Sequence, residues 1–432
     1  MPGQDTSSVD DILKRFYEGG IRELIPNDVK TLRKFEERDA SEWGGQGVTY
    51  PIRVGRNQGV GYTAEMGSIP PAGRQQYTTV LIPMRYLHGR VQFSTQAMKA
   101  SQGNKSAFAP VMEQEMDGLI RDLANERGRV IFGDGRGVLA LVNGDPGTTT
   151  VVTLDAPGGF AGAINGSRFI NPGALITFVA PATGAIVASA DETVASVPAA
   201  GTTVNISTAA AAAIADNDYV VRSNKAAVTD VSDTSFNKEA MGLSGLIDDG
   251  TYVATLHGVN RTTYPLFQST VIANVGAISA DVIQRAIDLA EQRGGGNIDT
   301  MICHQSVRRA YLLLMEDQRR YMGGDLSRPD AGTKAAKGGT LTFGGIELLP
   351  DKYAPYGTLF GCDTSSWRRY VEVSGEWMNE DGSILQRLGS GSTAQDAFEA
   401  IYRIWDNFHV EKPNASFRLD GIASTVVVAH LD

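Results

Sequence analysis

The chain has 432 residues, which corresponds to about three domains, and a net charge of −10. Its hydrophobic share of 42% is typical of a soluble globular protein. The excess of 49 acidic over 39 basic residues argues against a protein whose main task is to grip nucleic acid. The two cysteines, Cys303 and Cys362, exclude a disulfide scaffold and a multi-cysteine zinc site and fit a reducing compartment.

Two further features of the composition bear on partners and location. Of the basic residues, 28 are Arg and 11 are Lys, which favours planar, multidentate contacts of the kind found at protein interfaces. No run of about 18 apolar residues occurs, and the first residues have neither a basic nor an apolar region. We therefore expect neither a membrane span nor a signal peptide.

Residues 1–46 are predicted to form a charged, partly helical arm. Ser8 is a suitable cap for a first helix, and a second short helix is expected to reach about Arg38. The apolar stripe on the first helix includes Ile12, Phe16 and Tyr17. Because so short a segment has little core of its own, the stripe is expected to dock elsewhere. The sequence leaves open whether it docks on the same chain or on another subunit.

Residues 47–100 are predicted to form an extended loop. Two β-type arms, Val48–Val54 and Gln76–Ser94, flank a tip rich in Gly and Pro. An isolated two-stranded ribbon is marginal in water, so the loop is expected to lean on a neighbour, and another subunit is one such neighbour.

A long helix and a β-rich block are predicted next. Three-to-four spacing of apolar residues predicts a helix over Asn104–Phe132, which Gly133 ends. Residues 137–235 then alternate short β-type runs with Gly, Pro, Asn and Asp turns, which predicts a small all-β domain with an acidic surface. Its expected strands lie in VVTLDA, GALITFV, GAIVAS, TTVNIS and DYVVRS.

Helices and strands alternate in the following part, which predicts an α/β domain. Periodicity places helices at Ser279–Arg293 and Gln305–Met322, with the buried strand DTMICH between them. Thr340–Leu349 and Gly357–Cys362 are expected strands, and long extended stretches follow.

No catalytic or metal-binding motif is convincing. The sequence contains no P-loop, no H-E-x-x-H and no G-x-S-x-G pattern. His304 beside Cys303 offers too few ligands for a metal, and His304 fits better as a helix cap. The segment Asp248-Asp249-Gly250 is most simply a turn, since calcium would need more oxygen ligands. We therefore expect no enzyme, no cofactor and no metal.

The order of these segments resembles that of the major capsid proteins of tailed bacteriophages, which have the Hong Kong 97-type fold. The local matches are GLSGLIDDG (242–250), HGVNRTTYPLFQSTV (257–271), DTMICHQSVRRAYLLL followed by GGTLTFGGIELLPDKYAPYGTLFGCD, and FEAIYRIWDNFHVEKPNASFRL near the end. The resemblance implies an α+β fold with an N-terminal arm, an extended β-hairpin loop, a spine helix in a peripheral domain, an α/β axial domain and an inserted all-β domain.

The resemblance also implies boundaries for these parts. They are the arm at 1–46, the loop at 47–100, the spine helix at 101–136, the inserted domain at 137–235, the axial domain at 236–362, the peripheral strands at 363–415, and a strand at 416–432 that returns to the axial domain.

The function implied by the resemblance is assembly. Such subunits form hexamers and pentamers that build an icosahedral shell around double-stranded DNA without sequence-specific binding. The loop would lie over a neighbouring subunit, and the arm would reach across the capsomer. The candidate inter-subunit contacts are Arg53, Arg56, Arg74, Arg85, Arg90, Ile12, Phe16 and Tyr17. The implied partners are a separate scaffolding protein, a portal and a decoration protein, with no membrane. The implied location is the virion capsid, after assembly in the host bacterial cytoplasm.

Two alternatives remain at this stage. An encapsulin-like compartment shell would keep the fold and change the cargo, although such proteins are usually shorter and lack a large insertion. A carbohydrate-active enzyme with a β-rich binding module would need paired carboxylates and aromatic platforms, and the 8% of aromatic residues show no such clustering.

Overall fold

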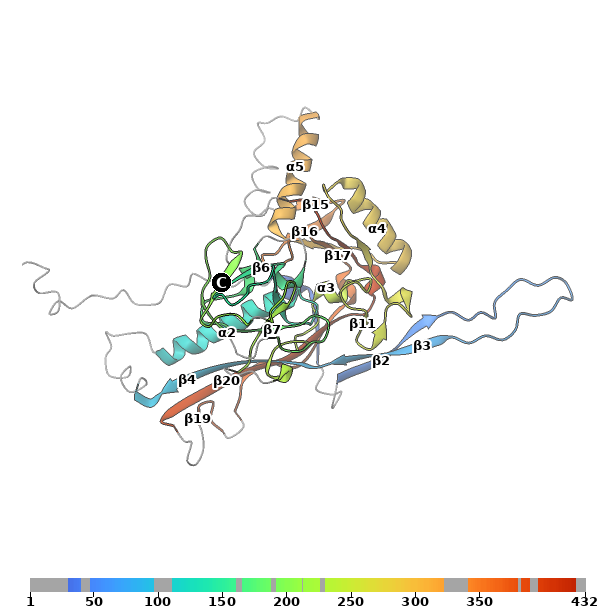
Figure 1. The fold of residues 1–432 in the computed structure, drawn as a ribbon. Coiled ribbons are helices and arrows are strands. Elements are labelled where there is room, and N and C mark those ends of the chain that lie inside the picture. The colour runs from blue at the N-terminus through green and yellow to red at the C-terminus, as the bar shows by residue number, and fades with distance from the viewer. Residues whose placement is uncertain are drawn as a thin grey trace, which may run out of the picture. The chain divides into compact units, whose positions relative to one another are not determined.

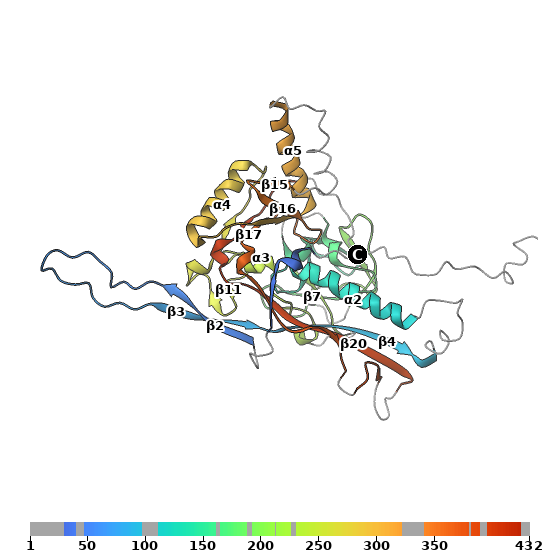
Figure 2. The ribbon, with the colours of Figure 1, turned by 180° about the vertical axis from the view of Figure 1, so that it is seen from behind.

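The chain, whose ribbon is drawn in Figures 1 and 2, folds into two compact units. The computed structural model describes residues 30–39, 47–96, 111–160, 165–187, 192–211, 213–225, 230–321, 341–379, 382–388 and 395–424. Among these, the first unit takes 88–124 and 375–403, and the second unit takes the rest.

Four long elements run from one unit into the other: β4 (Arg85–Ser94), α2 (Val111–Val130), β18 (Trp367–Trp377) and β20 (Ala397–Val410). Within the first unit, β19 (Gln386–Arg387) pairs antiparallel with the start of β20. Arg90 Nε lies 2.9 Å from Glu399 Oε2, which ties β4 to β20. The first unit is therefore built on strands and on the first part of the predicted long helix.

A six-stranded sheet forms one part of the second unit. Its strands follow the order β13 (Thr270–Ile272), β21 (Phe417–Leu419), β17 (Leu359–Cys362), β14 (Thr300–Cys303), β16 (Ile346–Pro350) and β15 (Leu341–Phe343). The strand near the C-terminal end, β21, thus lies between β13 and β17, with parallel pairing to the first and antiparallel pairing to the second.

Two helices cover one face of this sheet, α4 (Ala280–Gly294) and α5 (Gln305–Tyr321) (Figure 1). Met301 and Cys303 of β14 point toward them, whereas Ile302 points to the opposite face because side chains alternate along a strand. The Ser279 hydroxyl caps α4 and Gly295 ends it in a left-handed conformation. Both helices and the strand between them were predicted from the sequence and are confirmed.

Between α2 and α3 (Leu243–Leu246), the chain forms a closed barrel of six strands. Around the barrel the strands are β10 (Tyr219–Arg222), β5 (Val138–Val142), β6 (Val151–Asp155), β9 (Thr203–Ile206), β8 (Glu192–Ser196) and β7 (Leu175–Val179). Closure leaves no free sheet edge, which is one way a small β domain avoids edge-to-edge pairing. Buried aliphatic and aromatic side chains fill its interior, among them Val152, Leu154, Ile176, Phe178, Val204 and Val220.

The strand predictions for this block are partly right. The runs containing β6, β7, β9 and β10 are strands as predicted, and β5 and β8 are additional strands that were not predicted. The prediction of a strand at GAIVAS was wrong. Among the described residues of this run, only Ile186 forms a β-bridge, a single one to Val179.

The described part of the N-terminal arm packs on its own chain. It consists of η1 (Thr31–Lys34) and β1 (Glu36–Asp39), and β1 pairs parallel with β18. The Phe35 ring lies 4.5 Å from that of Trp367. The expected helix up to Arg38 is in part a 3-10 helix, at Thr31–Lys34, and is wrong from Glu36 on, because burial of Phe35 and pairing with β18 override local helix preference.

The expected extended loop contains a hairpin of β2 (Gly47–Gly55) and β3 (Gln76–Pro83). The predicted second arm, Gln76–Ser94, is two strands: β3 pairs with β2, whereas β4 pairs with β20. A second, short hairpin, β11 (Thr255–Leu256) and β12 (Val259–Asn260), lies against the first, where the Leu81 N–H donates to the His257 carbonyl at 2.9 Å.

The remaining described elements are short 3-10 turns, namely η3 (Pro157–Gly159), η4 (Gly166–Phe169), η5 (Val231–Asp233), η6 (Pro265–Phe267), η7 (Thr364–Ser366) and η9 (Pro413–Ala415).

A close backbone contact at Gly242 gives a first testable prediction. A Cβ atom there would overlap the carbonyl oxygen of Val130 and lie 2.6 Å from that of Ile131, both at the end of α2. We expect Gly242→Ala to lower the free energy of unfolding by about 1–3 kcal/mol, the usual cost of overpacking. The matched control is Gly118→Ala in α2, where a Cβ meets nothing within 4 Å. The control should raise stability slightly, by up to about 1 kcal/mol. Urea unfolding of both variants checks this, and equal stabilities would contradict it.

Candidate functional site

The β2–β3 hairpin has one buried and one exposed face. Val48, Val80 and Ile82 are buried in the main core of the second unit. On the opposite face, Leu81 lies across from Thr49, and Tyr77 lies across from Arg53. Tyr77 is 65% exposed and Leu81 is 43% exposed. The root of the hairpin therefore docks on its own chain, and its outer face is left to solvent.

The hairpin tip, residues 56–75, exposes large apolar side chains. Val60, Tyr62, Met66 and Ile69 are between 76% and 109% exposed. The contacts that shape the tip are local, such as the bond from the Gly59 N–H to Asn57 Oδ1 at 2.8 Å. Large apolar side chains exposed together on one segment are typical of an interaction surface. We call these four residues the tip patch.

The predicted contact arginines fall into two groups. Arg53, Arg56 and Arg74 are exposed on the hairpin, and no carboxylate among the described residues forms an ion pair with them. Arg85 and Arg90 instead have partners in their own chain. Arg85 donates to the Asn237 carbonyl at 3.1 Å, and Arg90 pairs with Glu399. The geometry thus leaves the first three available to a partner.

The apolar stripe of Ile12, Phe16 and Tyr17 lies outside the described residues.

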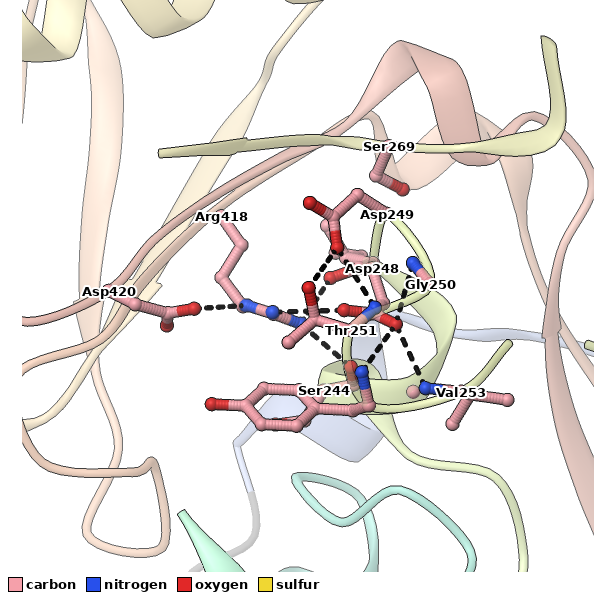
Figure 3. Close-up of polar contacts among 12 residues, drawn as sticks. Ser244, Asp248, Asp249, Gly250, Thr251, Val253, Ser269, Arg418 and Asp420 are labelled. Atoms are coloured by element: carbon pink, nitrogen blue, oxygen red, sulfur yellow. Dashed lines mark hydrogen bonds and ion pairs between the residues drawn. The ribbon is translucent and has the colours of Figure 1, made fainter. Parts of the chain in front are cut away.

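A buried charge network was missed by the sequence analysis. Asp248, Arg261 and Arg418 lie beside each other with at most 1% of each side chain exposed. Arg418 Nη2 is 3.0 Å from Asp248 Oδ1, and Arg261 Nη1 is 3.4 Å from Asp248 Oδ2. Asp420 Oδ2 accepts from Arg418 Nε at 2.7 Å (Figure 3). Two arginines and two carboxylates of the second unit therefore balance in charge.

This network also satisfies backbone groups at the end of α3. Arg261 donates to the carbonyls of Gly245 and Leu246, and Arg418 donates to those of Ser244 and Ile247. Helix ends leave their last carbonyls without intrahelical partners, so these guanidinium groups replace the missing donors. The network holds the segment after α3 against β21, although 170 positions separate Asp248 from Arg418.

The turn at Asp248 supplies the other half of the network. Asp248 Oδ2 accepts hydrogen bonds from the N–H groups of Gly250, Tyr252 and Val253, each at 3.0 Å (Figure 3). The prediction of a turn at this place is confirmed. Burial lowers the pKa of Arg261 to about 10, against the attraction of Asp248, so the guanidinium remains charged at neutral pH. For Arg418, burial acts in the same direction, but Asp420 and Asp248 outweigh it and raise the pKa.

Arg168 fastens the barrel to the loop that follows β16. Its side chain is 1% exposed and donates to the carbonyls of Lys352 and Ala354, the second at 3.1 Å. The guanidinium also lies 4.4 Å from the centre of the Tyr356 ring. One buried side chain thus fixes the barrel by hydrogen bonds and by stacking.

The metal-ligating types of side chain do not cluster among the described residues. Among them, no three His, Cys, Asp or Glu side chains gather in a way that could hold a metal ion. His304 accepts from the Ser306 N–H at 3.1 Å, so its predicted role as a helix cap is confirmed. No helix in the part of the chain that the structure describes is long and apolar enough to cross a membrane.

Of the comparisons with known proteins, the one with solved structures bears on the fold. Neither a protein-family model nor a curated protein matches the sequence. A chain from the capsid asymmetric unit of cyanophage A-1(L) is similar, with a TM-score of 0.60, 10% identity, and coverage of 97% of this chain and 99% of that one. A chain from the capsid of the native GTA particle has a TM-score of 0.50 and 9% identity, and covers 97% and 99%. At such low identity the likeness concerns the fold, and this chain has the mixed α and β fold of a cyanophage capsid chain.

Proposed function

We propose that this chain is the structural subunit of a closed shell, a major capsid protein that many copies build around a phage genome. The observation that carries the proposal is the likeness to the cyanophage capsid chain, which extends over 97% of this chain and 99% of that one. A likeness over nearly the whole of both chains supports a common architecture throughout, rather than one shared module.

The proposal extends to the parts of the fold. The sheet with α4 and α5 is assigned to the axial domain of a Hong Kong 97-type subunit, and α2, β18 and β20 to its peripheral domain. The barrel of residues 138–222 is assigned to an inserted domain. Copies would form hexamers and pentamers around double-stranded DNA, with a scaffolding protein, a portal and a decoration protein as partners, and would assemble in the host cytoplasm.

The tip patch is the proposed contact with the next copy. Val60, Tyr62, Met66 and Ile69 have no core of their own, and burial of one such side chain typically contributes about 1.5–3 kcal/mol. Arg53, Arg56 and Arg74 flank the patch and could add hydrogen bonds to carboxylates or carbonyls of the partner. The described part of the arm, by contrast, pairs with β18 of its own chain. The proposed extension across the capsomer is therefore assigned to residues 1–29.

Electron microscopy of the purified chain tests the proposed function. The expected result is closed particles or rings of copies, and sedimentation should find them far above the 46.1 kDa of one chain. A strictly monomeric species over a wide range of protein concentration would overturn the proposal. Protein cargo in place of nucleic acid in particles isolated from cells would instead favour a compartment shell.

A further inference from the structure

We propose that Tyr50, His257 and His409 form an acid-sensitive latch that holds the root of the β2–β3 hairpin, and that protonation of the two histidines releases it. The inference depends on contacts within a single chain. If the hairpin holds a neighbouring copy, as proposed above, acid would also weaken that hold, and only this consequence rests on the proposed function.

The three side chains come from three separate elements. The Tyr50 hydroxyl of β2 is hydrogen-bonded to Nε2 of His409 on β20, with the ring centres 5.6 Å apart. His257, between β11 and β12, lies edge-on to His409 at 5.1 Å, and its Nε2 is 3.3 Å from the Phe408 carbonyl oxygen. The His257 carbonyl accepts from the Leu81 N–H of β3 at 2.9 Å. Both strands of the hairpin are therefore tied to the histidine pair.

The surroundings of the cluster stabilise neutral imidazoles and destabilise charged ones. His409 is fully buried, and its Nδ1 has no hydrogen-bond partner among the described residues. A protonated imidazole donates from both nitrogens, so a charged His409 would bury a charged N–H without an acceptor. His257 is 7% exposed and close by, so a second charge would add repulsion.

The surrounding charges also oppose protonation. The charged or titratable groups that reach the three side chains come from the strands packed around them: Arg85 of β4, Arg261 after β12, Arg368 and Tyr370 of β18, and Glu411 after β20. The three arginines act on the imidazoles, and the Tyr370 phenol, the Glu411 carboxylate and Arg368 act on Tyr50.

These effects set the direction of the pH response. Burial above all lowers the pKa of His257 to about 4, assisted by Arg261 and Arg85 and opposed by the bond to Phe408. Burial, His257 and Arg368 likewise hold the pKa of His409 well below its usual value. Once the hairpin is released and water reaches both imidazoles, their pKa returns to about 6.5. The released form then binds more protons, so the latch is intact above about pH 6.5 and weakens as the pH falls toward 4.

Hydrogen exchange of the full chain at pH 7.0 and 4.5, corrected for the intrinsic effect of pH, measures the latch. The amide of Leu81 is the direct reporter, because its partner is the His257 carbonyl. From the pKa of His257 alone, protection of this amide and of its neighbours in β2 and β3 should be roughly 60-fold lower at pH 4.5 than at pH 7.0. Amides of β5 and β7 in the barrel, whose residues 137–235 contain no histidine, should keep their protection, which separates release of the hairpin from unfolding of the unit.

Three variants complete the test. In the double variant His257→Gln and His409→Gln, which carries no titrating ring, hairpin protection should be the same at both pH values. If the double variant does not fold, His257→Gln alone must still reduce the response. The matched control, His88→Gln, changes an exposed histidine of β4 and should respond like the unmodified chain. Equal hairpin protection at both pH values in the unmodified chain would overturn the proposal. So would a full response in the double variant, or loss of β5 and β7 protection together with that of the hairpin.

Discussion

Asp248→Asn is expected to lower the free energy of unfolding by about 3–5 kcal/mol, the usual cost of leaving a buried charge without its partner. The variant keeps the shape of the side chain but leaves Arg261 and Arg418 facing each other without the carboxylate between them. The new amide also brings a donor to a place where one oxygen accepts three backbone N–H groups. Urea or thermal unfolding of the purified chain measures the loss.

The adjacent residue provides the control. Asp249 is only partly buried, and its Oδ1 accepts from the Thr251 N–H at 3.0 Å and from the Thr251 hydroxyl at 2.6 Å. An asparagine oxygen can accept both bonds, so Asp249→Asn should change stability by less than about 1 kcal/mol. If Asp248→Asn were as stable as Asp249→Asn, the buried network would not hold the second unit together as described.

The triple variant Tyr62→Ser, Met66→Ser and Ile69→Ser is expected to abolish assembly and leave the chain folded. At about 1.5–3 kcal/mol for each side chain buried against a neighbour, each contact that a tip makes with the next copy loses several kcal/mol. In the isolated chain the three side chains are at least 85% exposed, so their replacement removes no buried contact from the core. Sedimentation and electron microscopy measure assembly, and the unfolding midpoint should stay unchanged.

Val151→Ser provides the comparison for this variant. Val151 is 46% exposed on β6 of the barrel, so this variant removes an exposed apolar side chain that lies outside the hairpin. The account predicts assembly of this variant. Normal assembly of the tip variant would remove the tip patch from the set of contacts between copies.

Elements with strong local signals could be predicted from the sequence. The helix α4 combines three-to-four spacing, the Ser279 cap and Gly295, so local rules suffice. The strand β5 was missed because its five residues, Val138–Val142, follow a glycine turn directly and show no alternation: all but Leu141 are buried. The arm was misjudged at 36–39 because pairing with β18 decides its conformation.

The buried network could be predicted only in part. The turn at Asp248 follows from Asp248-Asp249-Gly250, since a short carboxylate accepts from the backbone two residues on. Its burial depends on Arg418, and no local rule joins residues 170 positions apart. One signal was available: Arg418 stands between Phe417 and Leu419 in a strand near the end of the chain, where a charged side chain needs a buried partner.

Cryo-electron microscopy of particles formed by the chain tests the central claim most directly. The account predicts a closed shell in which the tip patch, Val60, Tyr62, Met66 and Ile69, is buried against a neighbouring copy while Val48, Val80 and Ile82 stay buried in their own chain. Particles in which the tip folds back on its own subunit, or a chain that remains monomeric under every assembly condition, would contradict it.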